Sequence, residues 1–362
     1  MTPARLLLTH QPPDGDRETA VDLGPWLRSF RYTDRSRGEA DSLDIELDDT
    51  DGRFSGRGAF VDASWAFELG SRLTASLVPP HDGDGAAPAP LPLGTFEVDQ
   101  DETRGPDPSV VVVGAQSAAV LGSASQGFRR HKRSAAYEGP SLRAVCAAVA
   151  SRHDLALEYL AATDPPVERA DQRDEADAAF LARVCDRFGL LLSVRSQTPG
   201  GALSVVIYDE AGLSTAPAVT VRRGECEGFT LPRTLHTRAR AATCSYYDPA
   251  KGESVEVRVG QAETADGRTP ETLTIRARVG TEAEARALAT AALVRGARAG
   301  ADGRLDLAPG RIDLVAGVVV QLVGFGAPDG RYLCTESSHE GSASGYRTSA
   351  QIVALPSSPS SS

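Results

Sequence analysis

Cysteine and aromatic residues are scarce in this 362-residue sequence. The five cysteines lie far apart and include no CxxC pair, so a disulfide scaffold is not expected. Cys146 and Cys185 fall on apolar faces of expected helices, where a free cysteine acts as a small buried hydrophobic residue. Aromatic residues make up only 6% of the chain. That fraction gives little support to a carbohydrate-binding module, which needs aromatic platforms, but the alternative stays open.

Positive charge and long hydrophobic runs are also limited. The chain has 38 Lys and Arg residues against 49 Asp and Glu residues, a formal net charge of -11. This balance argues against a dedicated nucleic-acid binder, because such proteins present a basic face. Near the start only Leu6–Leu8 are consecutive leucines before polar residues return. Neither a secretory signal nor a membrane span is expected, so we expect synthesis in the cytoplasm and no membrane anchoring.

No motif in the sequence indicates catalysis or cofactor binding. HExxH, a GxSxG nucleophile elbow, a phosphate loop and a GxGxxG after a strand are all missing. No acid is singled out as the apolar-pocket partner that sugar hydrolysis needs. The one basic cluster, "RRHKR" at 129–133, is interpreted as a contact for an acidic protein surface. We therefore expect no catalytic residue, no cofactor and no bound metal.

Residues 40–54, "ADSLDIELDDTDGRF", concentrate carboxylates in one short stretch. A calcium-binding EF-hand loop aligned on Gly52 fails at both ends, because Leu47 and Gly58 would occupy ligand positions. "DDTDG" is better interpreted as a turn, in which side chains such as Asp49 accept hydrogen bonds from nearby amides and Gly52 takes a positive φ. Before it, apolar residues alternate with acids at the period of a half-buried antiparallel strand. These apolar residues are Leu43, Ile45 and Leu47.

Three helices are expected among the strands. The first lies within 139–155, and its apolar stripe is formed by Leu142, Val145, Cys146 and Val149. The second lies within 172–189, with Asp174 as the N-cap and Gly189 at the C-terminal end. Its apolar face consists of Phe180, Leu181, Val184, Cys185 and Phe188. The third is predicted to start at Thr281, with a glutamate three residues later completing a capping box.

The order of these segments predicts a mainly β protein with an α/β insert, and so an α+β fold. The expected division is 1–120 for a first β-barrel domain and 121–200 for an α/β connecting segment with two amphipathic helices. Residues 201–355 are expected to form a second β-barrel domain with one helix, and 356–362 a disordered tail. The segment 79–92, rich in Pro, Gly and Asp, is expected to be an exposed, mobile loop.

The two β-rich regions share a faint sequence pattern. Gly70 opens "GSRLTASL" and Gly94 opens "GTFEV", while Gly317 opens "GVVVQLV" and Gly330 opens "GRYLC". Each pair consists of a glycine, an alternating strand, a polar loop, and then a glycine two residues before an aromatic one. This pattern indicates a duplicated β-barrel.

Three segments together resemble one known family. The first is "DSLDIELDDTDG" with the downstream "LGTFEVD". The second, "QRDEADAAFLARVCDRFGLLLSV", is similar to the family pattern Q-x-x-E-S-D-x-x-F-L, with Ala176 where the family often has serine. Its matching positions are Gln172, Glu175, Asp177, Phe180 and Leu181. The third, "HEGSASGYRTSAQIV", supplies His339, Gly345 and Tyr346. The family is that of the baseplate hub proteins of contractile tails, including the late control D protein of P2-like phages and the hub part of VgrG-type spikes. The resemblance runs from about residue 20 to 355.

What this resemblance implies is a structural role in assembly. The family's fold would place two related barrels in each chain of a homotrimer. The trimer would adapt a hexameric tail tube to a separate trimeric spike within the baseplate of a virion tail or injection particle, beside wedge proteins. DNA or protein cargo would pass through without specific binding, and an acidic lumen would suit such a conduit. A cell-wall hydrolase using Asp49 or Asp51 remains the enzymatic alternative.

Overall fold

The computed structural model describes the chain over residues 4–12, 21–35, 41–56, 67–78, 90–107, 109–117, 128, 131–139, 141–196, 203–209, 213, 217–232, 239, 241–248, 252–260, 271–276, 279, 281–298 and 302–355. Strands predominate among them, which confirms the mainly β fold class. The expected tail and most of the expected loop at 79–92 lie outside the described residues. None of the helices in the described part is long and apolar enough to cross a membrane.

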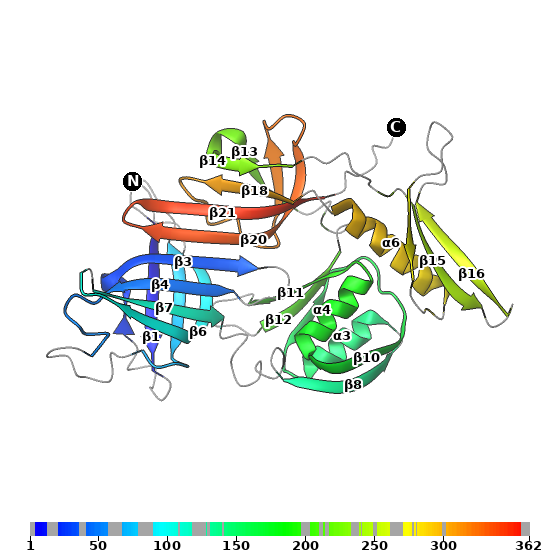
Figure 1. Ribbon diagram of the computed structural model, residues 1–362, viewed down its shortest axis with the longest axis horizontal. Coiled ribbons are helices and arrows are strands. Elements are labelled where there is room, and N and C mark those ends of the chain that lie inside the picture. Colours follow the sequence, from blue (N-terminus) through cyan, green and yellow to red (C-terminus); the bar gives the residue numbers. More distant parts are fainter. Residues whose placement is uncertain are drawn as a thin grey trace.

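Most strands belong to one large sheet (Figure 1). The N-terminal half of the chain contributes β1 (Arg5–Gln11), β2 (Val21–Asp22), β3 (Leu27–Arg35), β4 (Ser42–Asp48), β5 (Arg72–Val78), β6 (Leu91–Arg104) and β7 (Val110–Ser117). The C-terminal half contributes β13 (Ala218–Arg222), β14 (Cys226–Thr230), β18 (Asp302–Leu307), β19 (Val319–Val323), β20 (Gly330–Ser342) and β21 (Gly345–Ala354). The order is β14-β18-β21-β20-β3-β4-β7-β6-β5-β1-β2, and β13 lies beside β19, which pairs with β20.

Alternation of side chains explains how these strands build their core. In β4, Leu43, Ile45 and Leu47 are at most 1% exposed, and the acids between them lie on the other face. Successive side chains of a strand point to opposite faces, so one face of β4 packs while the other meets water. Strand β4 pairs antiparallel with both β3 and β7. The predicted half-buried strand is confirmed.

The large sheet contains the same arrangement twice. We call β1–β7 repeat 1, and β13, β14 and β18–β21 repeat 2. Repeat 1 has the order β3-β4-β7-β6-β5, and repeat 2 has the order β14-β18-β21-β20-β19. A short 3-10 helix precedes the first strand in each order, at Gly24–Trp26 before β3 and at Arg223–Glu225 before β14. Strand β1 has no counterpart, since β13 pairs directly with β19.

Details of the backbone also repeat. Gly70 N–H donates to Val98 O at 2.8 Å, and Gly317 N–H donates to the carbonyl of Cys334 at 2.7 Å. Both glycines have positive φ, of 94° and 85°, a conformation that favours glycine. The pairing of β6 with β7 slips after Val98, and that of β20 with β21 slips after Cys334. The same irregularity follows Leu27 between β3 and β4, and Cys226 between β14 and β18. The duplication predicted from the glycine pattern is confirmed.

The middle of the chain forms a separate α/β unit, at the lower right of Figure 1. Its elements are β8 (Lys132–Gly139), α3 (Leu142–Ser151), β9 (Ala156–Tyr159), β10 (Val167–Ala176), α4 (Asp177–Arg187), β11 (Leu191–Ser196) and β12 (Leu203–Tyr208). Both predicted helices are present, and their expected apolar residues lie in one core cluster. The boundary expected at residue 200 falls between β11 and β12, which pair with each other.

The N-terminus of α4 differs from the prediction. Asp174 is not an N-cap; it lies in β10 with a φ of 49°, and the cap residue is Ala176. Glu175 and Ala176 pair with Arg133 and Lys132 of β8, so pairing with a distant strand overrides the helical pattern of this acidic stretch. The C-terminal end agrees with the prediction, since Gly189 has a φ of 72°.

A further three-stranded sheet and a long helix complete the chain. The strands are β15 (Ala241–Asp248), β16 (Glu253–Gly260) and β17 (Thr272–Ile275), and the helix is α6 (Glu282–Arg298). The hydroxyl of Thr281 accepts a hydrogen bond from the amide of Glu284 at 3.2 Å, as the predicted cap requires. The helix expected within the second barrel domain instead packs in the same core as the middle unit.

Candidate functional site: the junction between the repeats

The two repeats meet where β3 pairs antiparallel with the C-terminal half of β20. The register runs from Glu336 opposite Arg35 to Ser342 opposite Ser29. Two ion pairs cross it, Arg31 Nε to Glu340 Oε1 at 2.9 Å and Arg35 Nε to Glu336 Oε2 at 3.2 Å. Residues more than 300 positions apart in sequence therefore join the repeats into one continuous sheet. We call this β3–β20 pairing the junction.

The buried side of the junction is closely packed and polar in part. His339 is completely buried, its ring lies 5.9 Å from that of Tyr32, and its Nδ1 lies 2.7 Å from the Tyr346 hydroxyl. Burial lowers the pKa of His339 to about 4 and raises the pKa of Tyr346. Both groups are therefore neutral at neutral pH, as buried polar groups tend to be. Phe30 packs on Gly341 so closely that a Cβ there would lie 2.2 Å from the ring.

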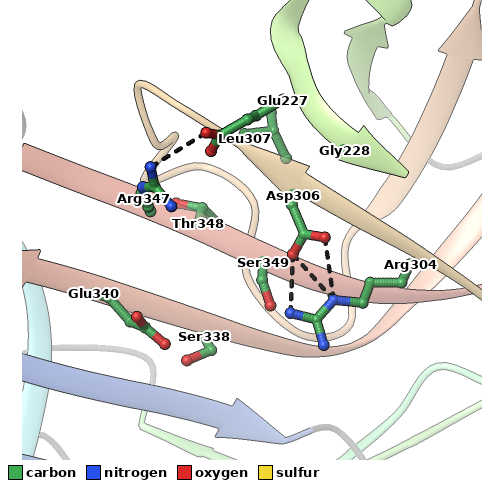
Figure 2. Close-up of a pocket in the computed structure, with 10 residues that line it drawn as sticks. All are labelled: Glu227, Gly228, Arg304, Asp306, Leu307, Ser338, Glu340, Arg347, Thr348 and Ser349. Carbon is green, nitrogen blue, oxygen red and sulfur yellow. Dashed lines mark hydrogen bonds and ion pairs between the residues drawn. The ribbon is translucent and has the colours of Figure 1, made fainter. Parts of the chain in front are cut away.

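The opposite face of the sheet is polar and hollowed beside the junction. Figure 2 shows this hollow, which is lined by Glu227, Gly228, Arg304, Asp306, Leu307, Ser338, Glu340, Arg347, Thr348 and Ser349. Its charged side chains are paired, Glu340 with Arg31 of the junction and the others with each other. Arg347 binds Glu227 at 3.2 Å and Arg304 binds Asp306 at 3.0 Å. Such a mixed, self-paired lining offers neither an activated nucleophile nor an acid held in an apolar pocket.

The carboxylate-rich turn after β4 is structural. Asp49 is fully buried, and its Oδ1 accepts a hydrogen bond from the amide of Phe54 at 2.8 Å. Asp48 Oδ1 accepts from the amide of Thr50 at 2.9 Å, and Gly52 has a φ of 77°. The interpretation of "DDTDG" as a turn held by its own side chains is confirmed. No group of three or more His, Cys, Asp or Glu side chains that could hold a metal occurs in the described part of the chain.

A second polar cluster surrounds Asp177 at the start of α4. This carboxylate is fully buried and lies 2.6 Å from His153 Nε2, 2.7 Å from Gln172 Nε2 and 3.0 Å from Arg152 Nη1. Burial raises the pKa of Asp177, but these hydrogen bonds and the nearby arginines outweigh it and hold the pKa below its usual range. Arg133 Nε lies 3.5 Å away. Of the basic cluster interpreted as a partner contact, Arg133 therefore faces an acid of its own chain.

The remaining predicted residues lie around these two places. Phe180 and Leu181 are fully buried, and Phe180 stacks on Tyr137 with ring centroids 4.9 Å apart. Glu175 pairs with Arg183, whose hydrogen bond lowers the Glu175 pKa. Gly345 follows the turn between β20 and β21. The structure thus brings His339 and Tyr346 to the junction and places Gln172, Glu175, Asp177, Phe180 and Leu181 in the middle unit.

Sequence reasoning missed the β3 side of the junction. The segment 27–35 places Phe30 and Tyr32 on one face and Arg31 on the other, which is a signal for a strand. Nothing in that segment predicts that the strand pairs with β20. The fit of Phe30 to Gly341 depends on contacts between distant parts of the chain and has no local signature.

Comparisons with known proteins agree on one family. A family model described as phage tail baseplate hub (GPD) matches residues 112–345. The chain is 32% identical over 173 residues to a probable baseplate hub protein of Escherichia phage 186, a stretch covering 47% of this chain. It spans less than half the length of that relative, 38%.

Two solved structures show the same fold. A 43 kDa tail protein of prophage MuSo2 from Shewanella oneidensis matches with a TM-score of 0.64 at 14% identity, covering 97% of this chain and 98% of that one. A component of the type VI secretion system of E. coli matches with a TM-score of 0.53 at 13% identity, covering 92% of this chain and 74% of that one.

Proposed function

Because the chain belongs to the phage tail baseplate hub family, we propose that it acts as the structural hub of a contractile phage tail or contractile injection system. In this role three copies form a ring, which adapts a hexameric tail tube on one side to a separate trimeric spike on the other. Wedge proteins surround it in the assembled baseplate. The protein has no catalytic role in this proposal.

The observation that carries the proposal is the duplication of the sheet. Each chain holds repeat 1 and repeat 2 with one strand order and matching irregularities. A ring of three such chains offers six similar units, so a sixfold neighbour finds an equivalent surface at every step. We accordingly propose that the functional units are the repeats, with the middle unit and the β15–β17 sheet as additions at the periphery.

The polar face of the shared sheet suits the wall of a conduit. Several of its arginines pair with acids, as in Arg31 with Glu340 and Arg104 with Glu102. A wall of paired charges would hold passing DNA or protein weakly, because free cations are what retain polyanions. An electron microscopy map of the ring that turns this face outward would overturn this part of the proposal.

The hydrolase alternative gains no support. Asp49 is buried and holds backbone amides, and Asp51 pairs with Arg53 at 2.6 Å. Neither carboxylate lines the hollow beside the junction, whereas glycoside hydrolysis requires two acids that flank the bound sugar.

Native mass spectrometry of the purified chain tests the proposal. The expected result is a trimer that gains mass in steps of one tube ring and one spike trimer when these proteins are added. Electron micrographs should show rings with six similar lobes. A chain that stays monomeric at micromolar concentration and binds neither protein would refute the hub role.

A further inference from the structure

Several strand edges in the large sheet have no partner strand within the described residues, and two of them are related by the duplication. One is the outer edge of β14, the terminal strand of the sheet, which pairs only with β18. The other is the C-terminal part of β6 after Val98, where β6 pairs with β7 alone. Unpaired edges expose backbone donors and acceptors and invite another strand.

The duplication relates these two edges to the junction. Aligning the irregularities after Leu27 and Cys226 makes Phe229 of β14 the equivalent of Phe30 in β3. Aligning those after Val98 and Cys334 makes the end of β6 the equivalent of the C-terminal half of β20. Inside the chain, β3 and that half of β20 pair with each other. The unpaired edges of β14 and β6 are therefore equivalent to two edges, those of β3 and β20, that pair with each other within the chain.

Side chains at the free edges are complementary in the same way. Phe30 is buried against Gly341, whereas its equivalent Phe229 is 42% exposed. The equivalent of Gly341 is Gly105, where an added Cβ would meet only a side-chain oxygen at 3.8 Å. An exposed aromatic ring and an open glycine thus stand where the junction has a ring packed on a glycine.

The exposure of equivalent residues in β20 and β6 independently indicates that the end of β6 lacks a neighbouring strand. In repeat 2, Ser337 and His339 are fully buried, and the ring of His339 stacks on Tyr32 of the neighbouring repeat. Their equivalents in repeat 1 are Asp101 and Thr103, and both are exposed. Repeat 1 therefore lacks at this edge the neighbour that repeat 2 has.

We propose that β14 of one copy pairs antiparallel with the C-terminal end of β6 in the next copy of this chain. Transferring the junction register places Thr230 opposite Arg104 and Phe229 over Gly105. The contact is head-to-tail, the type of contact that forms a ring when its rotation closes, and each step around the proposed ring repeats the junction. This inference rests on the proposed trimeric hub and assigns the contact that closes it.

Cysteine cross-linking tests the register. The full-length double variant with Arg104→Cys and Thr230→Cys is oxidised and run on a denaturing gel, with the mass of the reduced sample measured in parallel. Directly opposite residues have Cβ atoms about 4.5–5.5 Å apart, close enough to be joined by a disulfide after slight adjustment. The expected result is covalent trimers that revert on reduction.

The matched control replaces Thr230→Cys with Glu227→Cys and keeps Arg104→Cys. Glu227 lies three residues along β14, about 10 Å out of register at the rise of a strand, and should not cross-link. The wild-type chain, with its five native cysteines, sets the background. Equal cross-linking in the control or in wild type would overturn the register.

A non-covalent test uses Phe229→Asp, which should weaken trimer association about tenfold or more, as losses of central aromatic anchors do. Leu160→Asp is its control, because Leu160 is 62% exposed and lies directly after β9 in the middle unit, and it should leave the trimer intact. If the double cysteine variant is a trimer under reducing conditions but forms no cross-link on oxidation, this inference is refuted and the hub proposal still stands. A monomeric wild-type chain would refute both. Cross-linking of Thr230→Cys only to another tail protein would also overturn the inference.

Discussion

Removing the buried carboxylate of Asp177 should loosen the middle unit strongly. Asp177→Ala leaves His153, Gln172 and Arg152 without the acceptor that lies 2.6–3.0 Å from them. Breaking a buried ion pair by deleting one partner costs about 3–5 kcal/mol. Arg152 and Arg133 are about one third exposed and can regain water, so we expect a loss near the lower end, about 3 kcal/mol.

Hydrogen exchange of the full-length chain measures this loss locally, because it reports the opening free energy of single segments. Amides of α3 and α4 should lose protection, while β4 and β21 in the large sheet keep theirs. The matched control is Asp171→Ala. Asp171 also pairs with two arginines, Arg169 and Arg173, but at the surface, where ion pairs contribute little.

The acid dependence supplies a second reading of the same site. The pKa of Asp177 is lower in the folded chain than in the unfolded one, so its contribution is present above its unfolded pKa and is lost as pH falls through the folded pKa. Asp177→Asn should remove that part of the acid sensitivity of α4. Loss of less than about 1 kcal/mol in Asp177→Ala, or a loss equal to that of Asp171→Ala, would refute the assigned role of this cluster.

Other substitutions test the junction and the duplication. Gly341→Ala should destabilise the junction by about 3 kcal/mol, because a Cβ would lie 2.2 Å from the buried ring of Phe30. Hydrogen exchange of the β3 and β20 amides measures this loss, and unchanged protection would contradict the prediction. Gly70→Ala and Gly317→Ala should each cost about 1–3 kcal/mol in thermal or urea unfolding, because both need positive φ; a large effect at only one would argue against equivalence. Burial lowers the pKa of His10 and of His339 to about 4. Each therefore stabilises the fold above about pH 6.5, and that contribution is lost as pH falls toward 4. Replacing both by Phe should flatten the stability curve between those values, and an unchanged curve would contradict the assignment.

Local sequence patterns predicted those helices and strands whose formation does not depend on which element they pack against. The alternation in β4 and the apolar stripe of α3 can be read directly, because one face of each meets a core whatever its detail. The first residue of α4 could not be predicted in this way. Glu175 pairs with β8, and this pairing extends a strand through an acidic stretch that resembles a first helical turn.

The candidate site was predicted only in part. His339 and Tyr346 were identified through their resemblance to a family, but the junction also needs Phe30, Tyr32 and Gly341, which carry no motif. Their fit depends on a register between strands some 300 residues apart, and register is set by packing across the sheet rather than by either segment alone.

The strand present in only one repeat has a geometric consequence. Because β1 stands between β5 and β2 in repeat 1 while β13 touches β19 directly in repeat 2, alternate lobes of a closed ring would differ in width. A sixfold partner could bind the surfaces that all six lobes have in common. A threefold partner could bind the features that distinguish alternate lobes. One polypeptide would thereby present two symmetries to two partners without changing its shape.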